Sequence, residues 1–278
     1  MAHCVVPEAE KILDKPFPVL TDGFVRLVDY LGGDRRIVQS ARVSYGEGTK
    51  TQRKDQGLID YLLRNDHTSP FEQVVLTYHS KMPIFVARQW VRHRTARLNE
   101  ISGRYSILNN DYYIPFPEHI SLQSSDNKQG RSEKPAGKEL RERVTGWFDA
   151  ERIRTYKAYQ EMVDSGIARE LARMVLPLNI YTEIYWQIDL HNLFHFIRLR
   201  LDRHAQLEIR KYAEILLVTA EKVAPLAVKA FKKHIQSGVR LSGGEADLVR
   251  TLLLENPAAL DNDSKETQRL KKKLGIDE

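Results

Sequence analysis

The chain has 278 residues, of which 42% are hydrophobic and 29% charged, a composition typical of a folded domain with a sizeable core. No run approaches the ~18 consecutive apolar residues of a membrane span, and residues 1–18 lack the apolar centre of a secretory signal, so we expect a soluble, cytoplasmic protein without a membrane partner. Cys4 is the only cysteine, which excludes an intramolecular disulfide and a cysteine-based zinc site, and the net charge of +6 suits a polyanion or a phosphate-bearing small molecule.

The first part of the chain is predicted to alternate short strands and helices. Residues 1–22 are expected to form an irregular N-terminal arm, and residues 24–30 a strand that ends at two glycines. Asp34 is expected to cap a helix, and a loop at residues 46–48 to precede another. The apolar positions of these two helices are Ile37, Val38 and Ala41 in the first, and Leu58, Ile59, Leu62 and Leu63 in the second.

A second set of elements surrounds the middle of the chain. Ser69, followed by Pro70 and by Glu72 at the third helical position, predicts a capping box at the start of a helix. Residues 74–81 are rich in β-branched and aromatic side chains and predict a strand. After this strand, a helix is expected to run towards Leu98 and to end in a polar turn.

The second half of the chain is predicted to be mainly helical. Residues 121–138 are polar and are interpreted as a mobile surface insertion. Long helical regions are expected at about 147–174 and 190–234. Residues 237–278 look like a separate helical tail, which leaves an α+β domain over residues 23–236.

The densest functional signal lies in residues 88–105, which carry five arginines and a single acidic residue. On a helix, Arg88 would share a face with Arg92, and Gln89 with His93. Guanidinium groups present a rigid fork that fits phosphate oxygens. A solvated basic helix face would give the same charge pattern, so the arginines alone do not decide between these two interpretations.

Arg92-His93-Arg94, followed after seven residues by Ser102, is the centre of an ordered set of motifs. The others are residues 41–45 (ARVSY), 67–72 (HTSPFE), 85–90 (FVARQW), 103–106 (GRYS), 169–173 (RELAR), 176–179 (LPLN) and 199–206 (LRLDRHAQ). In this order, over residues 23–234, the set resembles the flavin-dependent thymidylate synthases, also called the ThyX family.

The resemblance implies a fold, an assembly and a reaction. The fold would be a single α+β domain with a small, mostly antiparallel sheet and long helices, assembled as a homotetramer with FAD and dUMP bound where subunits meet. The reaction would be the reductive methylation of dUMP to dTMP. Methylenetetrahydrofolate would supply the carbon, FAD reduced by NADPH would supply the hydride, and tetrahydrofolate would be released. The other class of thymidylate synthase uses a cysteine thiolate, and Cys4, in the unmatched arm, is no plausible nucleophile.

The resemblance also carries over roles for individual residues. Arg200 and Ser102 are the catalytic candidates, although Ser102 has no sequence-local base and is expected to bind phosphate rather than to attack. Arg200 matches the arginine that ionises or polarises the uracil at N3, where a fixed guanidinium would stabilise the negative charge that builds up on the base. The positions matched to dUMP binding are Gln89, Arg92, Glu100, Ile101, Ser102, Gly103, Arg104, Arg173 and Arg200. The positions matched to FAD binding are Ser69, Arg92, His93, Arg94, Glu100, Asp189, Leu190, His191 and His195.

Some residues depart from the family pattern, and two alternatives stay open. The stretch from Asp189 to His195 differs from the expected combination, so its FAD contacts are uncertain in detail. His191 and His195 have the helical spacing of two metal ligands, but no third ligand is evident and no metal site is predicted. The alternatives are an arginine-rich nucleic-acid-binding protein, which would leave Gln89, Glu100 and Ser102 without a role, and a family member without synthase activity. We expect no nucleic-acid partner.

Overall fold

The computed structural model describes residues 4–43, 55–125, 128–262 and 264–276. The chain forms two compact units, residues 1–236 and residues 237–278. The strands are β1 (Pro16–Val19), β2 (Gly23–Leu31), β3 (Val75–Pro83), β4 (Arg97–Glu100), β5 (Ser121–Gln123), β6 (Arg131–Pro135) and β7 (Tyr181–Asp189). The α-helices of the larger unit are α1 (Pro7–Glu10), α2 (Asp34–Arg42), α3 (Asp55–Arg64), α4 (Ser69–Glu72), α5 (Ile84–Trp90), α6 (Lys138–Asp164), α7 (Arg169–Ala172), α8 (Leu190–Arg200), α9 (Leu207–Val223) and α10 (Pro225–Phe231).

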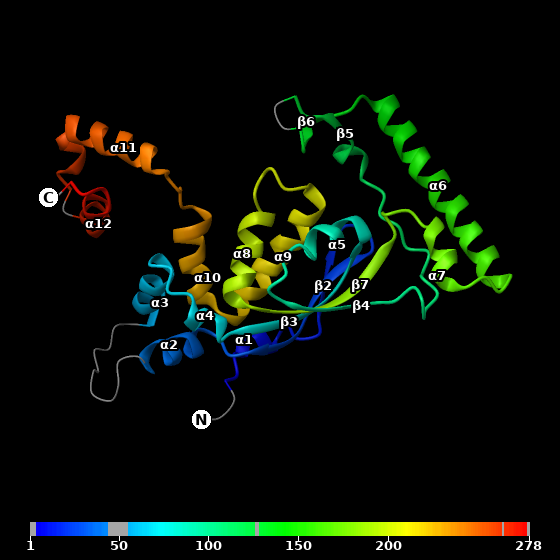
Figure 1. Cartoon of the computed structure of the whole chain (residues 1–278), viewed down its shortest axis with the longest axis horizontal. Helices are drawn as coiled ribbons and strands as arrows, with labels where there is room; N and C mark the ends of the chain where they lie inside the picture. Colours follow the sequence, from blue (N-terminus) through cyan, green and yellow to red (C-terminus); the bar gives the residue numbers. More distant parts are fainter. Residues whose placement is uncertain (1–3, 44–54, 126–127, 263, 277–278) are drawn as a thin grey trace. The chain divides into compact units, whose positions relative to one another are not determined.

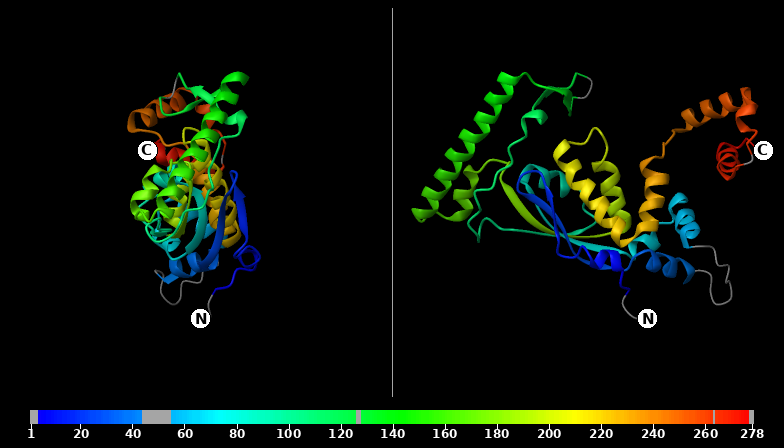
Figure 2. Two further views of the ribbon diagram at one scale, coloured as in Figure 1. Left: turned by 90° about the vertical axis from the view of Figure 1, so that its right-hand side faces the viewer. Right: turned by 180° about the vertical axis from the view of Figure 1, so that it is seen from behind.

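A five-stranded sheet with the order β1-β2-β3-β7-β4 forms the centre of the larger unit. All neighbouring strands in it are antiparallel. Leu76, Tyr78 and Met82 of β3 are buried on one face, whereas Thr77 and His79 point to the other and stay partly exposed. Helices α5, α8 and α9 pack on the buried face (Figures 1 and 2). The predicted combination of helices with an antiparallel sheet is confirmed.

Aromatic rings join the helices to the buried face of the sheet. Trp90, the last residue of α5, is fully buried. Its ring centroid lies 5.1 Å from that of Trp186 on β7, 4.8 Å from that of Phe196 on α8 and 5.9 Å from that of Tyr212 on α9. Such aromatic pairs add to the energy of apolar burial. These contacts hold the end of α5 in place, and with it the start of the segment 91–96 that follows.

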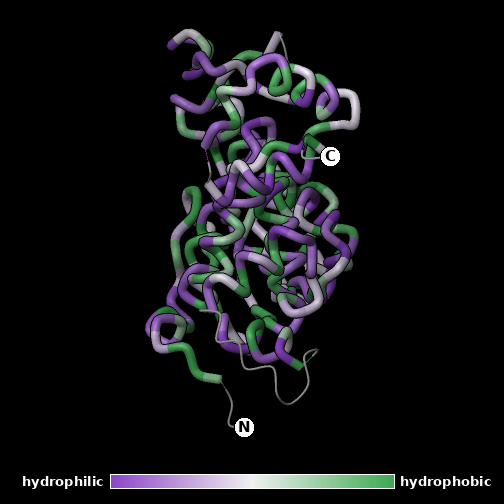
Figure 3. The backbone as a smooth tube through the Cα atoms, turned by 90° about the vertical axis from the view of Figure 1, so that its left-hand side faces the viewer, coloured by the Kyte–Doolittle hydropathy of each residue, from purple (hydrophilic) through white to green (hydrophobic). Residues whose placement is uncertain are grey.

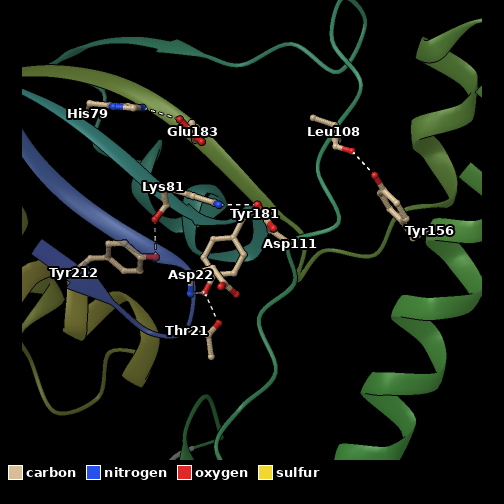
Figure 4. Close-up of polar contacts among 10 residues, drawn as sticks. All are labelled: Thr21, Asp22, His79, Lys81, Leu108, Asp111, Tyr156, Tyr181, Glu183 and Tyr212. Atoms are coloured by element: carbon tan, nitrogen blue, oxygen red, sulfur yellow. Dashed lines mark hydrogen bonds and ion pairs between the residues drawn. The ribbon is translucent and has the colours of Figure 1, made fainter. Parts of the chain in front are cut away.

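The other face of the sheet carries a polar and aromatic group of side chains (Figure 4). Nε2 of His79 lies 2.8 Å from Oε2 of Glu183, and the His79 ring stacks on Tyr185 with the centroids 4.6 Å apart. Nζ of Lys81 donates to Oδ2 of Asp111 at 2.7 Å. These contacts connect β3 to β7 and to the segment after β4.

Two helix caps differ from the sequence prediction. Asp34 begins α2 without capping it, because its carboxylate accepts from the backbone N–H groups of Leu226 and the following residue at 2.7 and 2.9 Å and so caps α10. Ser69 is the first residue of α4 rather than its N-cap. The N-cap is Thr68, whose hydroxyl donates to Glu72 at 3.2 Å. Helices α2 and α3 are confirmed, and the seven apolar residues predicted for these two helices are all buried.

The helix predicted from residue 84 to Leu98 is too long. It ends at Trp90, and Leu98 lies on β4, which pairs with β7. Arg92 and His93 therefore come after the helix and do not share its faces with residues 88 and 89. The pairing with β7, a strand remote in sequence, makes residues 97–100 a strand rather than a continuation of the helix.

Three further segments contain strands that the sequence does not predict. The N-terminal arm is not wholly irregular, because it contains α1 and β1, and β1 pairs with β2. The segment 181–189, for which no element is predicted, is the long strand β7 between β3 and β4. Residues 121–138 hold the β5–β6 hairpin, and α6 begins directly after it, earlier than predicted. The predicted loop at residues 46–48 lies outside the described residues.

A buried ion pair fastens this hairpin to the core. Nη2 of Arg131 on β6 donates to both carboxylate oxygens of Glu208 on α9, at 2.8 and 2.7 Å. Nη1 of the same arginine donates to the carbonyl of His119 at 2.8 Å, and the Tyr113 hydroxyl donates to Glu208 at 3.0 Å. Glu208 is only 2% exposed. A segment that is polar in sequence is thus anchored by one of its charged residues.

The smaller unit contains α11 (Gly243–Glu255) and α12 (Lys265–Leu274), in keeping with the predicted helical character of this part. Leu248 and Leu252 of α11 are 60% and 50% exposed, so these two leucines lie at the surface of the helix. Along the described chain, hydrophobic and hydrophilic residues are interspersed (Figure 3). None of the described helices is long and apolar enough to cross a membrane.

Candidate functional site

Arg200, the last residue of α8, is half-buried and held in place by two hydrogen bonds. Its Nε donates to Nε2 of His93 at 3.0 Å, and its Nη2 donates to the backbone carbonyl of Gln89 at 3.0 Å. Burial lowers the pKa of Arg200 from its ordinary value, and the nearby charge of Arg92 lowers it further. The two bonds fix the plane of the guanidinium group, and its other N–H groups bond to no residue that the structure describes, so they can donate to a ligand.

His93 accepts this hydrogen bond as a neutral imidazole. Burial, followed by the charges of Arg200 and His195, lowers the pKa of His93 to about 4. At neutral pH its Nε2 therefore carries a lone pair that can accept from Arg200. The centroids of the His93 and His195 rings lie 5.9 Å apart, so two of the residues predicted to bind FAD are neighbours of the catalytic candidate.

Gln89 connects α5 to α9 through its side chain. Its Nε2 donates to Oε1 of Gln206 at 2.6 Å. Gln206 is the residue that precedes α9, and it belongs to the motif at residues 199–206. Sequence reasoning assigns it no separate role because its partner lies 117 residues away. We refer to Gln89, His93, Arg200 and Gln206 as the Arg200 cluster.

Ser102, Gly103, Arg104 and Arg173 form a second group, the Arg173 cluster. A Cβ atom on Gly103 would lie 3.2 Å from Cδ of Arg173, so glycine lets the arginine pack closely against this turn. The backbone N–H of Arg104 donates to Oγ of Ser102 at 3.3 Å, and Nε of Arg104 donates to Glu170 at 3.2 Å. Within the described parts of the chain, no histidine or carboxylate contacts the Ser102 hydroxyl.

Glu100 and Ile101 lie between these clusters in sequence, at the end of β4. Oε1 of Glu100 accepts from the hydroxyl of Thr182 on β7 at 2.7 Å. The backbone N–H of Ile101 donates to the carbonyl of Glu183 at 2.9 Å. Sequence reasoning placed Glu100 on a turn and missed Thr182, because β7 itself was not predicted.

The remaining FAD candidates gather near the start of α8. Oδ1 of Asp189 accepts from the N–H of Asn192 at 2.9 Å and caps the helix. The Leu190 side chain is fully buried and its N–H donates to the carbonyl of Val74, so this side chain is not exposed to a ligand. Ser69 begins α4, which packs against α8, and is exposed. His191, on the first turn of α8, is partly buried.

The exposed arginines fit phosphate groups. Arg92, Arg94 and Arg173 are exposed, and none of them forms an ion pair with any residue that the structure describes. Uncompensated guanidinium groups beside a polar turn match the pyrophosphate of FAD and the phosphate of a nucleotide. Among the described residues there is no group of three or more histidine, cysteine, aspartate or glutamate side chains that could hold a metal ion.

The predicted dUMP residues are not all brought together within one chain. The Arg200 cluster lies at the C-terminal ends of α5 and α8, whereas Arg173 comes directly after α7. Figures 1 and 2 draw α7 well apart from α8, towards the side of the unit where α6 lies. Each cluster is well organised by itself, and the two occupy different parts of the larger unit.

The structure also has a cavity that sequence reasoning did not find. Its volume is about 540 Å³, within the range of small-molecule sites. Apolar side chains line most of it, among them Phe85, Val144 and Phe148, and Gln206 of the Arg200 cluster lies on its wall. Its walls come from segments between residues 85 and 208, so no local pattern could reveal it.

Residues 26–226 match the model of the family described as thymidylate synthase complementing protein. The flavin-dependent thymidylate synthase of Treponema denticola is 58% identical over 94% of this chain and 98% of the relative, and that of Thermus thermophilus is 55% identical over 85% of each. The crystal structure of a UMP/dUMP methylase, PolB from Streptomyces cacaoi, bound with 5-Br UMP, is similar with a TM-score of 0.72 and 32% identity, over 80% of this chain and 99% of PolB. The chain therefore belongs to the flavin-dependent thymidylate synthase family.

Proposed function

We propose that this protein methylates dUMP to dTMP, with methylenetetrahydrofolate as the one-carbon donor and FAD reduced by NADPH as the hydride carrier, and releases tetrahydrofolate. The observation that carries the proposal is Arg200, a half-buried guanidinium group held by His93 and by the Gln89 carbonyl. Membership of the family and the similarity to a UMP/dUMP methylase support the same substrate. When bound, the flavin supplies the hydride, and the protein supplies position and electrostatics.

The two clusters suit the two ends of dUMP. In the Arg173 cluster, Arg173, Arg104 and the Ser102 turn present donors that match a phosphate. In the Arg200 cluster, the fixed guanidinium group can donate to a uracil carbonyl and stabilise the negative charge that precedes attack by C5. Because its orientation is fixed before the reaction, little reorganisation is needed when the charge develops. Ser102 therefore acts in binding rather than as a nucleophile.

The proposed FAD site also uses residues that fit the group. Arg92 and Arg94 are exposed guanidinium groups that can hold the pyrophosphate. His93, His195 and Glu100 would border the flavin. Asp189 supports this site by capping α8, since both of its carboxylate oxygens accept hydrogen bonds from Asn192.

We further propose that the active site forms between copies in a homotetramer. One copy would supply the Arg200 cluster and a second copy the Arg173 cluster, because the two lie apart within one chain. Trp147 and Ile153 on α6 are 56% and 61% exposed, and exposed large apolar side chains of this kind are typical of subunit interfaces. The symmetry of a closed homo-oligomer would repeat such a shared site in every copy.

The proposed reaction is tested by assaying the purified protein with dUMP, methylenetetrahydrofolate and NADPH. We expect dTMP and tetrahydrofolate in equal amounts, detected by chromatography, and no dTMP when any one of the three is omitted. The visible spectrum of the protein should show oxidised flavin that NADPH bleaches. Release of dihydrofolate instead, or dTMP formation without flavin, would overturn the proposed reaction.

The shared site is tested by mixing two inactive variants. We expect Arg173→Ala and Arg200→Ala each to be inactive alone, and their co-expressed mixture to regain about a quarter of wild-type turnover, since random assembly of a symmetric oligomer gives one site in four with both arginines. Turnover of the mixture no higher than that of the parents would place each site within a single chain. Size-exclusion chromatography with light scattering would show whether mixed tetramers had formed.

A further inference from the structure

The hydroxyl of Thr182 on β7 is a polar group on the buried face of the sheet. The other residues of β7 on this face are apolar and at most 2% exposed, namely Ile184, Trp186 and Ile188. Thr182 itself is 4% exposed, and valine, which has nearly the same shape, would fill its position without a hydroxyl that needs a partner. The hydroxyl therefore contributes through its hydrogen bond, which it donates to Oε1 of Glu100 at 2.7 Å.

The two other buried threonines that the structure describes donate to backbone carbonyls of their own helices. The Thr155 hydroxyl on α6 donates to the carbonyl of Glu151 at 2.6 Å, and the Thr219 hydroxyl on α9 donates to that of Ile215 at 3.0 Å. Such local bonds are common for threonine in helices. The Thr182 hydroxyl instead contacts a carboxylate 82 residues away in the chain, and hydrogen bonds to charged groups are stronger than those between neutral groups.

The main chain on both sides of this hydrogen bond is fixed by the sheet. Glu100 is the last residue of β4, and directly after it the backbone N–H of Ile101 donates to the carbonyl of Glu183 on β7 at 2.9 Å. On the opposite side of β7, Thr182 is paired with Met82 of β3. A β-branched side chain in a strand has few rotamers. The hydroxyl therefore has a defined position from which to hold the Glu100 carboxylate.

We propose that Thr182 is a positioning residue, which holds one oxygen of the Glu100 carboxylate so that the other is presented to a ligand as a fixed hydrogen-bond acceptor. Oε2 of Glu100 bonds to no residue that the structure describes, so it can accept from a ligand. Without the hydroxyl, the exposed Glu100 side chain would rotate freely, and ligand binding would have to overcome the entropy lost when it is ordered. The inference rests on the proposed function, in which Glu100 borders dUMP and FAD.

The ligand group that fits this acceptor is a hydroxyl. An ionised carboxylate only accepts hydrogen bonds, and its negative charge repels a phosphate, which the exposed arginines can bind instead. The N3 position of uracil is assigned to Arg200, so the donors that remain on dUMP and FAD are chiefly the hydroxyls of their sugars and of the ribityl chain. Because both ligands carry such hydroxyls, measuring the affinity of each one separately identifies which of them uses Glu100.

The test compares Thr182→Val, which keeps the shape of the side chain and removes the hydroxyl, with Thr182→Ser, which keeps the hydroxyl. The Kd of FAD is measured from flavin release when the loaded protein is diluted, and the Kd of dUMP from the change in the visible spectrum of the FAD-loaded protein. We expect Thr182→Val to raise at least one of these two Kd values by about five- to tenfold, the effect of losing one hydrogen bond. Thr182→Ser should bind both ligands nearly as tightly as wild type.

A stability measurement separates positioning from folding. Because Glu100 is exposed, water can solvate its carboxylate once the hydroxyl is gone, and valine places an apolar group among apolar neighbours. We therefore expect the Tm of Thr182→Val, extrapolated to zero FAD from a concentration series, to equal or exceed that of wild type while ligand binding weakens. As a matched exchange, Thr155→Val removes a hydroxyl that is similarly buried, at 6% exposure, and should leave both Kd values unchanged.

Three results would overturn the inference. These are unchanged Kd values in Thr182→Val, an equal loss of affinity in Thr182→Ser, or a lowered Tm that accompanies the weaker binding. A wild-type protein that binds neither FAD nor dUMP and forms no dTMP would instead refute the proposed function. A wild-type protein that forms dTMP, with ligand affinities that Thr182→Val shares, would refute only the role of Thr182.

Discussion

Replacing Arg200 by alanine is expected to lower dTMP formation by at least about a hundredfold, the usual effect of removing one fixed donor that stabilises charge in the transition state. Its guanidinium group is oriented before substrate arrives, by His93 on one side and the Gln89 carbonyl on the other. Flavin binding should survive, because the exposed Arg92 and Arg94 remain. Single-turnover formation of dTMP and the visible spectrum of the same sample give the two readouts.

The variant Arg200→Lys distinguishes the effect of the fixed, planar guanidinium group from the effect of its positive charge. Lysine keeps a positive charge but cannot hold hydrogen bonds to His93 and to the Gln89 carbonyl while presenting a planar fork to uracil. We expect turnover between those of wild type and Arg200→Ala. Wild-type turnover in Arg200→Ala would remove the assigned role of this residue, and equal turnover in the alanine and lysine variants would show that geometry, and not charge alone, matters.

Sequence reasoning predicted those elements whose residues contact one another locally. The apolar periodicity of α2 and α3 identified residues such as Ile37 and Leu62, which are buried in the core. The order of the motifs around Arg92-His93-Arg94 and Ser102 identified the family. Even the wrong helix caps, Asp34 and Ser69, lie within one residue of the N-cap of a real helix.

The features that could not be predicted depend on contacts between distant parts of the chain. Asp34 caps a helix 192 residues away, which no local pattern reveals. The strand β7 was missed because it lies between two helical regions, and its position between β3 and β4 is defined only by pairing. Because β7 is not predicted, its residue Thr182 could not be recognised as the hydrogen-bond partner of Glu100. The same applies to Gln206, whose significance appears only beside Gln89.

Replacing Arg131 by methionine is expected to destabilise the larger unit by about 2–4 kcal/mol, because it leaves the buried carboxylate of Glu208 without its cation. Arg131 donates to both oxygens of that carboxylate at 2.8 and 2.7 Å. The shift in the midpoint of urea unfolding, measured at a fixed protein concentration, gives the change. Replacing both members, as Arg131→Met with Glu208→Leu, should restore most of the lost stability, because no buried charge is left unpaired.

The matched control is an ion pair of similar length on the surface. Nη2 of Arg154 lies 2.7 Å from Oε2 of Glu151 on α6, with both side chains largely exposed. Exposed pairs contribute little because water solvates the separated charges nearly as well. Arg154→Met should therefore leave the unfolding midpoint almost unchanged. An equally small effect of Arg131→Met would show that the Glu208 carboxylate finds another partner or water when the arginine is absent.

The pH dependence of this effect distinguishes a buried charge from a simple loss of packing. Burial by itself would raise the pKa of Glu208, but the hydrogen bonds and charge of Arg131 more than offset it, and the pKa lies below the ordinary glutamate value of about 4.5. The wild-type pair therefore contributes its full stability above that value and loses it as pH falls through the lowered pKa. In Arg131→Met burial is opposed only by the hydrogen bonds from the Tyr113 hydroxyl and from the backbone, so we expect the pKa of Glu208 to rise and acid to make the carboxylate neutral. The difference in stability between the two proteins should consequently shrink as the pH is lowered below about 5. A difference that stays constant with pH would assign the effect to lost packing of the arginine side chain instead.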